Sequence, residues 1–255
     1  MSLLYSVKHA INFGFSLAEV QFKERNEGSY LGILWYLLNP ILMFGLLLLI
    51  FYDRVGGEIK HYPLYLLLGI IIFNYFQRVT TESTICIPVN KGIIKSVNFP
   101  RLALVGSIVI THIFSHFFEI LLLLLFLIYY KVSPVGIIVY PIVLIFFSLF
   151  VYGISLMLAA IHVYFIDLKH IWDFLARLIW LGTPIFYPIG GQKRLFIVNL
   201  FNPIYYYMTI SRDIIIYHEM PPLWMIAGAA FYSIMFFVIG FLVFSKLKNK
   251  FAEMI

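Results

Sequence analysis

Charged residues are scarce in this chain. Asp, Glu, Lys and Arg together make up 12% of its 255 residues, whereas soluble domains carry about 25%. Hydrophobic residues make up 62%, and the mean hydropathy is +0.96. A soluble fold of this length cannot bury so much apolar surface. We therefore expect most of the chain to lie in the hydrocarbon of a lipid bilayer.

Signatures of disulfides, metal binding and nucleotide binding are also missing. The one cysteine, Cys86, excludes an intrachain disulfide and a metal site built from several cysteines. The sequence has no G-x-x-x-x-G-K-[ST] phosphate loop, no Gly-rich dinucleotide fingerprint, no G-x-S-x-G motif and no H-E-x-x-H pair. The chain therefore cannot be an ATPase by itself. If the protein moves something against a gradient, the energy must come from a partner or from coupled ions, and the few ionisable residues inside its apolar runs disfavour ions.

Long apolar runs fill most of the sequence. Runs of this length can cross about 30 Å of hydrocarbon as helices, in which every backbone polar group is satisfied within the segment. They predict six transmembrane spans at 31–51, 62–85, 102–130, 134–164, 171–189 and 222–245. No internal repeat or linker divides the chain. The sequence therefore predicts an all-α integral membrane protein with a single domain over 1–255.

Two further segments do not fit a span. In residues 1–29, apolar side chains recur at helical spacing beside a polar face, which predicts an amphipathic helix in the membrane interface or, alternatively, a soluble cap. The stretch between the fifth and sixth spans is too polar to cross and too apolar for a free loop. We expect it to form short re-entrant or surface helices on the periplasmic side. Gly182, Thr183, Pro184 and Pro188 are expected to break the fifth span and to supply either a re-entrant turn or a hinge.

The distribution of Lys and Arg predicts the orientation. With six spans, ten of the 18 lie on the side of both termini and six on the other side. The positive-inside rule then places both termini in the cytoplasm. The basic residues form no dense patch, so the net charge of +6 does not indicate nucleic-acid binding.

Four segments resemble the membrane subunit of ABC-2 type polysaccharide exporters, a bacterial family that moves lipid-linked O-antigen, capsule or teichoic acid chains. The first is RNEGSYLGILWYLLNP at 25–40. The second combines PLYLLLGIIIFNYF at 63–76 with VNKGIIKSVNFPR at 89–101. The third is YFIDLKHIWDFLARLIWLGTPIFYPI at 164–189, and the fourth is NLFNPIYYYMTISRDIII at 199–216. Each motif alone is weakly specific, but their common order over most of the chain is characteristic of the family.

The resemblance implies a homodimer, or a closely similar arrangement, in a bacterial inner membrane, joined to two separately encoded ATP-binding subunits. That fits the missing phosphate loop. The substrate it implies is an undecaprenyl-diphosphate-linked glycan, passed from the cytoplasm to the periplasm. The permease itself would then be a transport subunit rather than an enzyme, and it would carry no cofactor. Aromatic residues make up 19% of the chain. Aromatic faces suit contact with sugars, although we expect most of these residues to form interfacial belts or to fill helix packing.

The resemblance also indicates where substrate is taken up. Arg25 precedes the first span, and a guanidinium there suits bidentate pairing with a diphosphate. The alternative is an anchor that contacts any anionic lipid. The predicted uptake group is Arg25, Asn26, Ser29, Tyr30 and Trp35.

Two cytoplasmic connections are candidates for contact with the ATPase. The segment Pro88–Arg101 has the spacing of a short amphipathic helix that could dock on that subunit, the alternative being a simple basic loop. The connection between the fourth and fifth spans is the second candidate. The predicted coupling residues are Lys91, Ile93, Ile94, Lys95, Asp167, Lys169 and His170.

One trio inside the third span has the residue types of a metal site. His112, His116 and Glu119 are spaced i, i+4 and i+7 on one helix face, and such ligands can bind Zn²⁺ or Fe. Polar contact between packed helices is the interpretation we favour, so no metal is expected. The trio also supports a rival function, an integral-membrane enzyme that acts on polyprenyl-linked sugars.

An aromatic run lies where a polymer would leave on the periplasmic side. Tyr205, Tyr206, Tyr207 and Arg212 are predicted to form a gate there, the alternative being interfacial anchoring. An ABC-2 permease for a drug or small lipid remains a further alternative, because it would share the topology.

Overall fold

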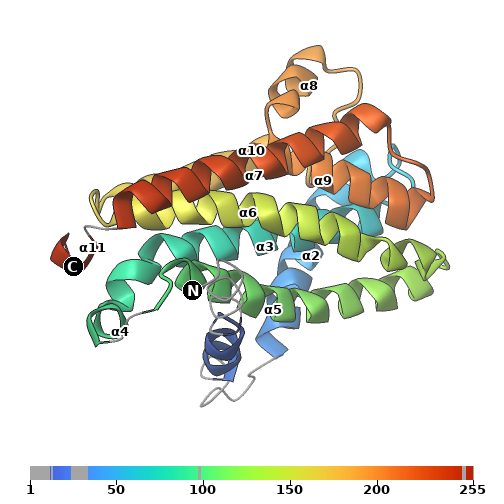
Figure 1. Cartoon of the computed structure of the whole chain (residues 1–255). Coiled ribbons are helices and arrows are strands. Elements are labelled where there is room, and N and C mark those ends of the chain that lie inside the picture. The colour runs from blue at the N-terminus through green and yellow to red at the C-terminus, as the bar shows by residue number, and fades with distance from the viewer. Residues whose placement is uncertain (1–11, 13, 24–33, 97–98, 249–250, 255) are drawn as a thin grey trace.

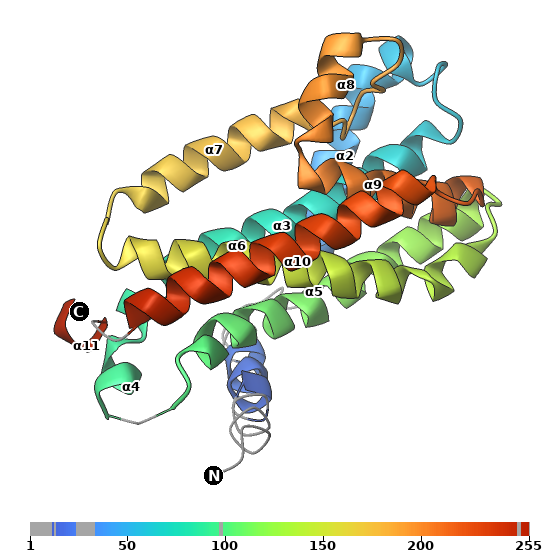
Figure 2. The same ribbon diagram turned by 45° about the horizontal axis from the view of Figure 1, so that its top comes forward.

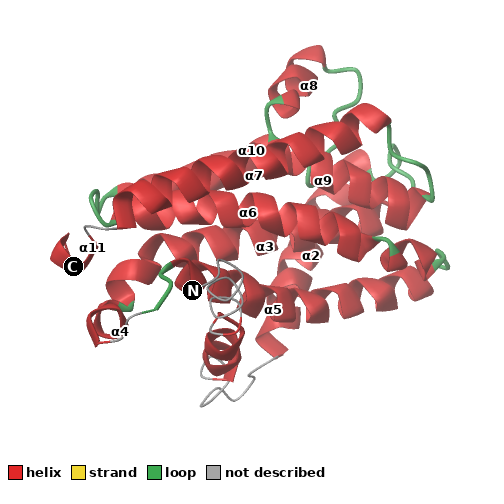
Figure 3. Ribbon diagram, viewed as in Figure 1, coloured by secondary structure: helices red, strands yellow, loops and turns green. Residues whose placement is uncertain are grey.

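Every regular element that the described residues form is a helix. The computed structural model describes residues 12, 14–23, 34–96, 99–248 and 251–254 (Figure 1). Figure 3 shows helices joined by short loops in these ranges, with no strand among them. The predicted all-α fold class is therefore confirmed for this part of the chain.

The helices alternate between long rods and short connecting pieces. Residues 14–23 form the first described helix. The following helices are α2 (Leu34–Val55), α3 (Tyr62–Val89), α4 (Lys91–Ser96), α5 (Leu102–Tyr129), η1 (Pro134–Ile138), α6 (Tyr140–His162), α7 (Leu168–Gly182), α8 (Lys193–Leu200), α9 (Pro203–Arg212), η2 (Asp213–Tyr217), α10 (Leu223–Leu247) and α11 (Phe251–Met254).

Five of the described helices, namely α2, α3, α5, α6 and α10, are long and apolar enough to cross a membrane. They contain 22 to 28 residues, and at about 1.5 Å per residue this length spans the hydrocarbon. Five predicted spans correspond to them, with one correction. The predicted span 134–164 begins with the 3-10 helix η1, and the long helix α6 starts at Tyr140.

The predicted span at 171–189 differs more. Its helix, α7, contains only 15 residues and ends at Gly182. Thr183 has extended backbone angles (φ −85°, ψ 136°), because Pro184 disfavours the helical conformation of the preceding residue and has no N–H to continue the ladder. The predicted span 171–189 is therefore not one continuous helix, and the break expected at Gly182, Thr183 and Pro184 is confirmed. The described chain has five helices of full length and one shorter apolar helix in place of six full spans.

α3 lies at the centre of the helical bundle. It packs against α5 and α6, and α6 in turn packs along α10. Helices in lipid gain little from hydrophobic burial and depend on close packing instead. Gly153 of α6 and Gly240 of α10 allow that approach, because a Cβ added to either would overlap the backbone of the other helix.

The helix at 14–23 lies against α5. The hydroxyl of Thr111 donates a hydrogen bond of 3.3 Å to the carbonyl of Ala18, and the ring of Phe22 meets that of Phe114 edge-to-face at 6.0 Å. A helix thus occupies residues 14–23 of the predicted interface segment 1–29, and residues 1–11, 13 and 24–29 lie outside the described ones. Its position in a membrane interface stays a prediction.

The short elements gather at the two ends of the bundle (Figures 1 and 2). α4, α11 and the turn between α6 and α7 lie together at one end, which we call the α4 end. α9, η2 and the connection between α5 and α6 lie at the opposite end, which we call the α9 end. Elements far apart in the sequence thus lie together at one end of the bundle or the other, as expected for a chain that crosses a membrane several times.

Candidate functional site

The half of α3 nearer the α4 end exposes a polar face. Residues 62–73 at the other half are all buried, whereas five polar residues that share one face further along are partly exposed. We call this set the α3 polar face: Asn74, Gln77, Arg78, Thr81 and Glu82. Amide and charged groups are costly against hydrocarbon, so a membrane-spanning helix that exposes them marks contact with water, substrate or another chain.

α7 adds a charged stripe beside this face. Trp172 turns inward, where its indole N–H donates to the hydroxyl of Thr80 at 3.1 Å. Lys169, Asp173 and Arg177 are spaced i, i+4 and i+8 and so share a neighbouring stripe of α7. Each of them is exposed or partly exposed. The other edge of α7 faces α6 and α10. By helical register, the charged stripe lies on the edge of α7 that points away from α6. The α3 polar face also points away from α6, so the two surfaces lie on the same side of the bundle.

Arg78 begins a buried polar network that joins three spans. Its guanidinium donates to one carboxylate oxygen of Glu119 on α5. The other oxygen of Glu119 lies 3.2 Å from Nδ1 of His116. Nε2 of His116 is 2.7 Å from the hydroxyl of Tyr140 on α6. Glu119 and His116 are each 1% exposed, so the network replaces water as their hydrogen-bonding environment.

The three residues predicted as possible metal ligands do not converge on one point, because they pair with different partners. His112, His116 and Glu119 lie on one buried face of α5, as their spacing predicts. His112, however, has its Nε2 2.8 Å from a carboxylate oxygen of Glu82 on α3, whereas His116 pairs with Glu119. In the described ranges, no group of three or more His, Cys, Asp and Glu side chains could hold a metal ion. This geometry agrees with the interpretation as polar contacts between packed helices.

The α4 end carries the predicted coupling residues. The short helix expected within Pro88–Arg101 is present as α4, with Ile94 buried (7% exposed). The side chain of Ile93 is not among those described. The remaining predicted coupling residues are exposed or partly exposed at this end: Lys91, Lys95, Asp167, Lys169 and His170. The structure thus brings both predicted connections to one end of the bundle (Figure 1).

Most of the predicted uptake group lies outside the described residues. Arg25, Asn26, Ser29 and Tyr30 belong to 24–33, which the structure does not describe. Trp35 is in the first turn of α2, where its side chain is 52% exposed. Only this residue of the group has a described position.

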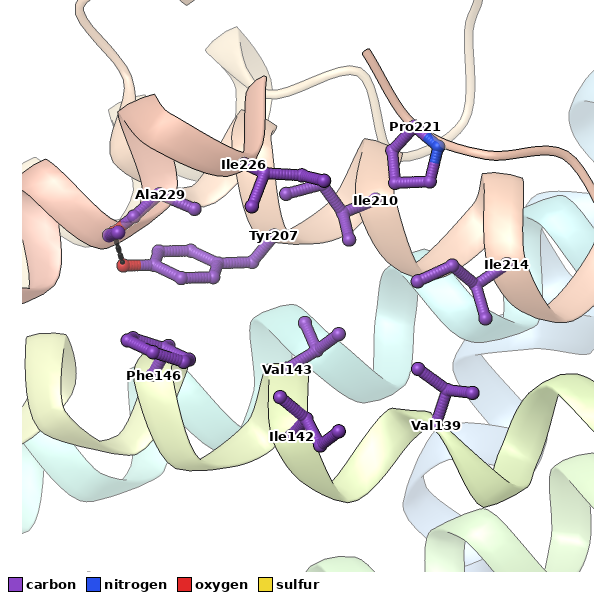
Figure 4. Close-up of a pocket in the computed structure, with 11 residues that line it drawn as sticks. Val139, Ile142, Val143, Phe146, Tyr207, Ile210, Ile214, Pro221, Ile226 and Ala229 are labelled. Atoms are coloured by element: carbon purple, nitrogen blue, oxygen red, sulfur yellow. Dashed lines mark hydrogen bonds between the residues drawn. The ribbon is translucent and has the colours of Figure 1, made fainter. Parts of the chain in front are cut away.

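The predicted gate tyrosines are buried within the subunit. Asn202 caps α9 by accepting a hydrogen bond from the backbone N–H of Ile204, and Pro203 suits the first turn. Tyr207 borders an apolar crevice of about 200 Å³ between α6 and α10. Its hydroxyl donates to the carbonyl of Ala229 at 2.8 Å (Figure 4). Tyr206 donates to the carbonyl of Leu200. These tyrosines fasten α9 to α8 and α10, and their role as a gate stays a prediction.

Arg212 is also buried, with 3% of its surface exposed. Its guanidinium donates to the carbonyls of Pro184 (2.8 Å), Ile185 (3.1 Å) and Tyr65 (3.1 Å). It also stacks 3.3 Å above the centre of the Tyr65 ring. Gly69 leaves room for it, because a Cβ there would collide with the guanidinium. Arg212 therefore ties α9 to α3 and to the turn that follows α7.

Asp213 follows directly at the start of η2. Burial, together with the nearby Glu219 carboxylate, raises the pKa of Asp213 from about 3.8 to about 6, although Arg212 opposes the shift. The α9 end thus has a carboxyl group that changes charge close to neutral pH.

Sequence reasoning missed five polar residues in the spans and in α7. Arg78, Glu82, Asp173 and Arg177 are ionisable residues within apolar helices, and Tyr140 is the partner of His116. The signal was present, because Arg78 with Glu82 and Asp173 with Arg177 are both spaced i, i+4. Treating every ionisable residue inside an apolar helix as a candidate would have found four of them.

Comparison with known proteins identifies relatives along the full length of the chain. An O-antigen export system permease protein RfbA from Myxococcus xanthus is 27% identical over 244 residues, which cover 94% of each chain. Two proteins of the same name from Klebsiella pneumoniae are 27% and 25% identical and cover 98% and 100% of this chain, and 100% and 99% of their own.

The family model of the ABC-2 type transporter matches residues 15–216. The match extends from the first described helix to η2 and contains both the α3 polar face and the buried network. The chain therefore belongs to the ABC-2 type transporter family.

Proposed function

We propose that this chain is the permease subunit of an ABC exporter that passes an undecaprenyl-diphosphate-linked polysaccharide of the O-antigen kind from the cytoplasm to the periplasm. The observation that carries the proposal is the extent of the similarity. Three proteins named as O-antigen export permeases each match 94% or more of this chain. The absence of a phosphate loop supports a separate subunit that binds and hydrolyses ATP.

The proposed topology has six crossings, with α7 as the fifth. α6 ends at the α4 end, and α10 begins at the α9 end (Figure 2). The chain between them must therefore cross once, which α7 does together with the residues that follow it. A six-crossing chain has both termini on one side, and the excess of Lys and Arg places that side in the cytoplasm of a bacterial inner membrane.

A second copy of the chain supplies the other wall of the passage in this proposal. The α3 polar face and the charged stripe of α7 cannot face lipid without a large cost. Pairing these faces across a two-fold axis would enclose them around a polar space suited to sugars. Amide and hydroxyl groups such as Asn74, Gln77 and Thr81 can exchange hydrogen bonds with successive sugar units.

The α4 end is the proposed contact with the ATPase. Lys91, Lys95, Asp167 and His170 offer exposed charged or polar side chains there, while the buried Ile94 packs α4 onto the subunit. In the same proposal, the uptake group from Arg25 to Trp35 receives the diphosphate. The tyrosines of α9 govern release at the α9 end.

The test is a deletion of the gene in its host, with complementation by the intact gene. Surface polysaccharide and membrane-bound lipid-linked polymer are then measured in intact and in lysed cells. We expect surface polysaccharide to disappear, and polymer of normal structure to accumulate where reagents added to intact cells cannot reach it.

Two other outcomes would overturn the proposal. An enzyme acting on polyprenyl-linked sugars would leave the polymer absent or altered in structure, rather than accumulated. A permease for a drug or small lipid would leave the surface polysaccharide unchanged.

A further inference from the structure

A groove lies on the opposite edge of α7 from the charged stripe. It encloses about 450 Å³, within the range of about 300–1,000 Å³ that is typical of ligand sites. Figure 2 shows α7 set apart from α10, with α8 standing over the end of α7. α3 and α6 contribute lining residues between them, and Val198 and residues 201–204 line the end near α8.

The lining of the groove is almost entirely apolar. Phe76, Phe150 and Ile154 line it on the inner side, while Leu178 and Phe236 contribute from α7 and α10. No carboxylate and no cation is among its lining residues. In a bilayer, an apolar groove of this size would lose dispersion contacts along its whole wall if nothing filled it. The surrounding solvent that can fill it is the hydrocarbon chain of a lipid.

Helical register places a cation one turn from a lining residue at one end of the groove. Val198 and Phe201 line the groove and are 59% and 78% exposed. Arg194 precedes Val198 by four residues, so it lies one turn away on the same face of α8. Lys193 points about a quarter turn or more away by the same register. Both cations are exposed, and within the described part of the chain neither forms a salt bridge.

We propose that this groove binds an anionic phospholipid, with an acyl chain between α7 and α10 and the phosphate paired with Arg194. The apolar walls select a hydrocarbon chain, and the guanidinium at the end of the groove selects an anionic head group. The site lies across α7 from the α3 polar face. It therefore does not depend on which substrate the permease exports.

The test is lipid binding to the purified exporter, the permease together with its ATPase. Native mass spectrometry counts bound lipids as phosphatidylglycerol or phosphatidylcholine is added. We expect tighter binding of phosphatidylglycerol to one site per permease chain. Arg194→Gln should weaken that binding roughly fivefold, because one cation beside an anionic lipid is lost. Lys193→Gln is the matched control on the same helix and should have little effect.

A second pair of variants tests the groove itself. Val198→Trp should fill the groove and remove the site for both lipids. Its neighbour Ile197, 55% exposed and absent from the lining, provides the control Ile197→Trp, which should leave binding unchanged. Three results would each overturn the proposal: equal affinity for the two lipids, undiminished binding by Val198→Trp, or displacement of phosphatidylglycerol from the site by a polyprenyl phosphate.

Discussion

At the scale of single residues, the ion pair between Arg78 and Glu119 joins α3 to α5 inside the bundle. The carboxylate is 1% exposed, and the side chain of Arg78 is 23% exposed. Neither ion would be tolerated at this depth without the other, since an unpaired charge away from water is destabilising. The pair therefore commits α3 and α5 to one relative position.

Glu119→Ala should destabilise the protein by about 3 kcal/mol, because it leaves the Arg78 guanidinium without its counter-ion and His116 without an acceptor. Thermal unfolding of the purified protein in detergent measures the effect. The double variant Arg78→Met with Glu119→Leu should recover much of the loss, since it removes both charges at once. If the double variant were less stable than Glu119→Ala, the pair would not act as described.

Asp213 makes a pH-dependent contribution at the α9 end. Its pKa is raised in the folded protein, so the folded state favours the neutral carboxyl group. That stabilisation is fully present below about pH 4 and is lost as the pH rises through about 6. Asp213→Asn should therefore melt at a higher temperature than the parent at pH 7.5 and at the same temperature near pH 4. A difference in melting temperature that does not vary with pH would contradict this assignment.

At the scale of helices, α6 and α10 depend on two small residues where they cross. Gly240→Ala should destabilise the protein by about 2 kcal/mol or more, because its methyl group would overlap the backbone at Gly153. Gly45→Ala, in open space on α2, is the control. It should be neutral or slightly stabilising, since alanine is the better helix former. Equal melting temperatures for the two variants would refute the close crossing.

The positions of most spans follow from the sequence, because their apolar runs are long and are ended by polar residues. In the segment 171–189, hydropathy alone does not show where the helix ends, whereas the Gly and Pro residues predict a break. Mean hydropathy continues past Gly182, but Pro184 changes the backbone of Thr183, and the helix ends there. The short helix α4 could be predicted from the spacing of apolar residues before Pro100. Pairing between elements could not, because it depends on packing.

The polar sites were harder to predict for the same reason. His112, His116 and Glu119 could be placed on one helix face from their spacing alone. Their partners Glu82, Arg78 and Tyr140 lie on other helices, 24 to 41 residues away in the sequence. Arg212 and Tyr207 look like surface residues in sequence, yet both are buried, since α9 folds back against α3 and α10.

At the scale of the whole molecule, the two edges of α7 face different environments. The charged stripe adjoins the α3 polar face, whereas the apolar edge borders the groove. A single short helix thus separates a proposed polysaccharide passage from a proposed lipid site. The two ends of the bundle also differ. The predicted coupling residues whose side chains are described are exposed or partly exposed at the α4 end, except the buried Ile94, whereas the tyrosines of α9 are buried at the α9 end.

The assignment of the α4 end to the ATPase predicts a pattern of cross-links. Lys91→Cys and His170→Cys are exposed positions at this end, whereas Lys60→Cys is an exposed control before α3 at the other end. The native Cys86 is buried and should react little. With a short bifunctional reagent, the first two variants should cross-link to the ATPase and the control should not. Failure at both α4-end positions would place the contact elsewhere.

The central claim is transport of a lipid-linked polysaccharide, and a vesicle measurement tests it most directly. Inverted membrane vesicles that contain the permease, its ATPase and the lipid-linked polymer are exposed to an external glycosidase before and after ATP is added. The account predicts that ATP makes the polymer resistant to digestion, and that an ATPase variant unable to hydrolyse ATP abolishes this protection. Polymer that stays equally digestible with and without ATP, while the ATPase is active, would contradict it.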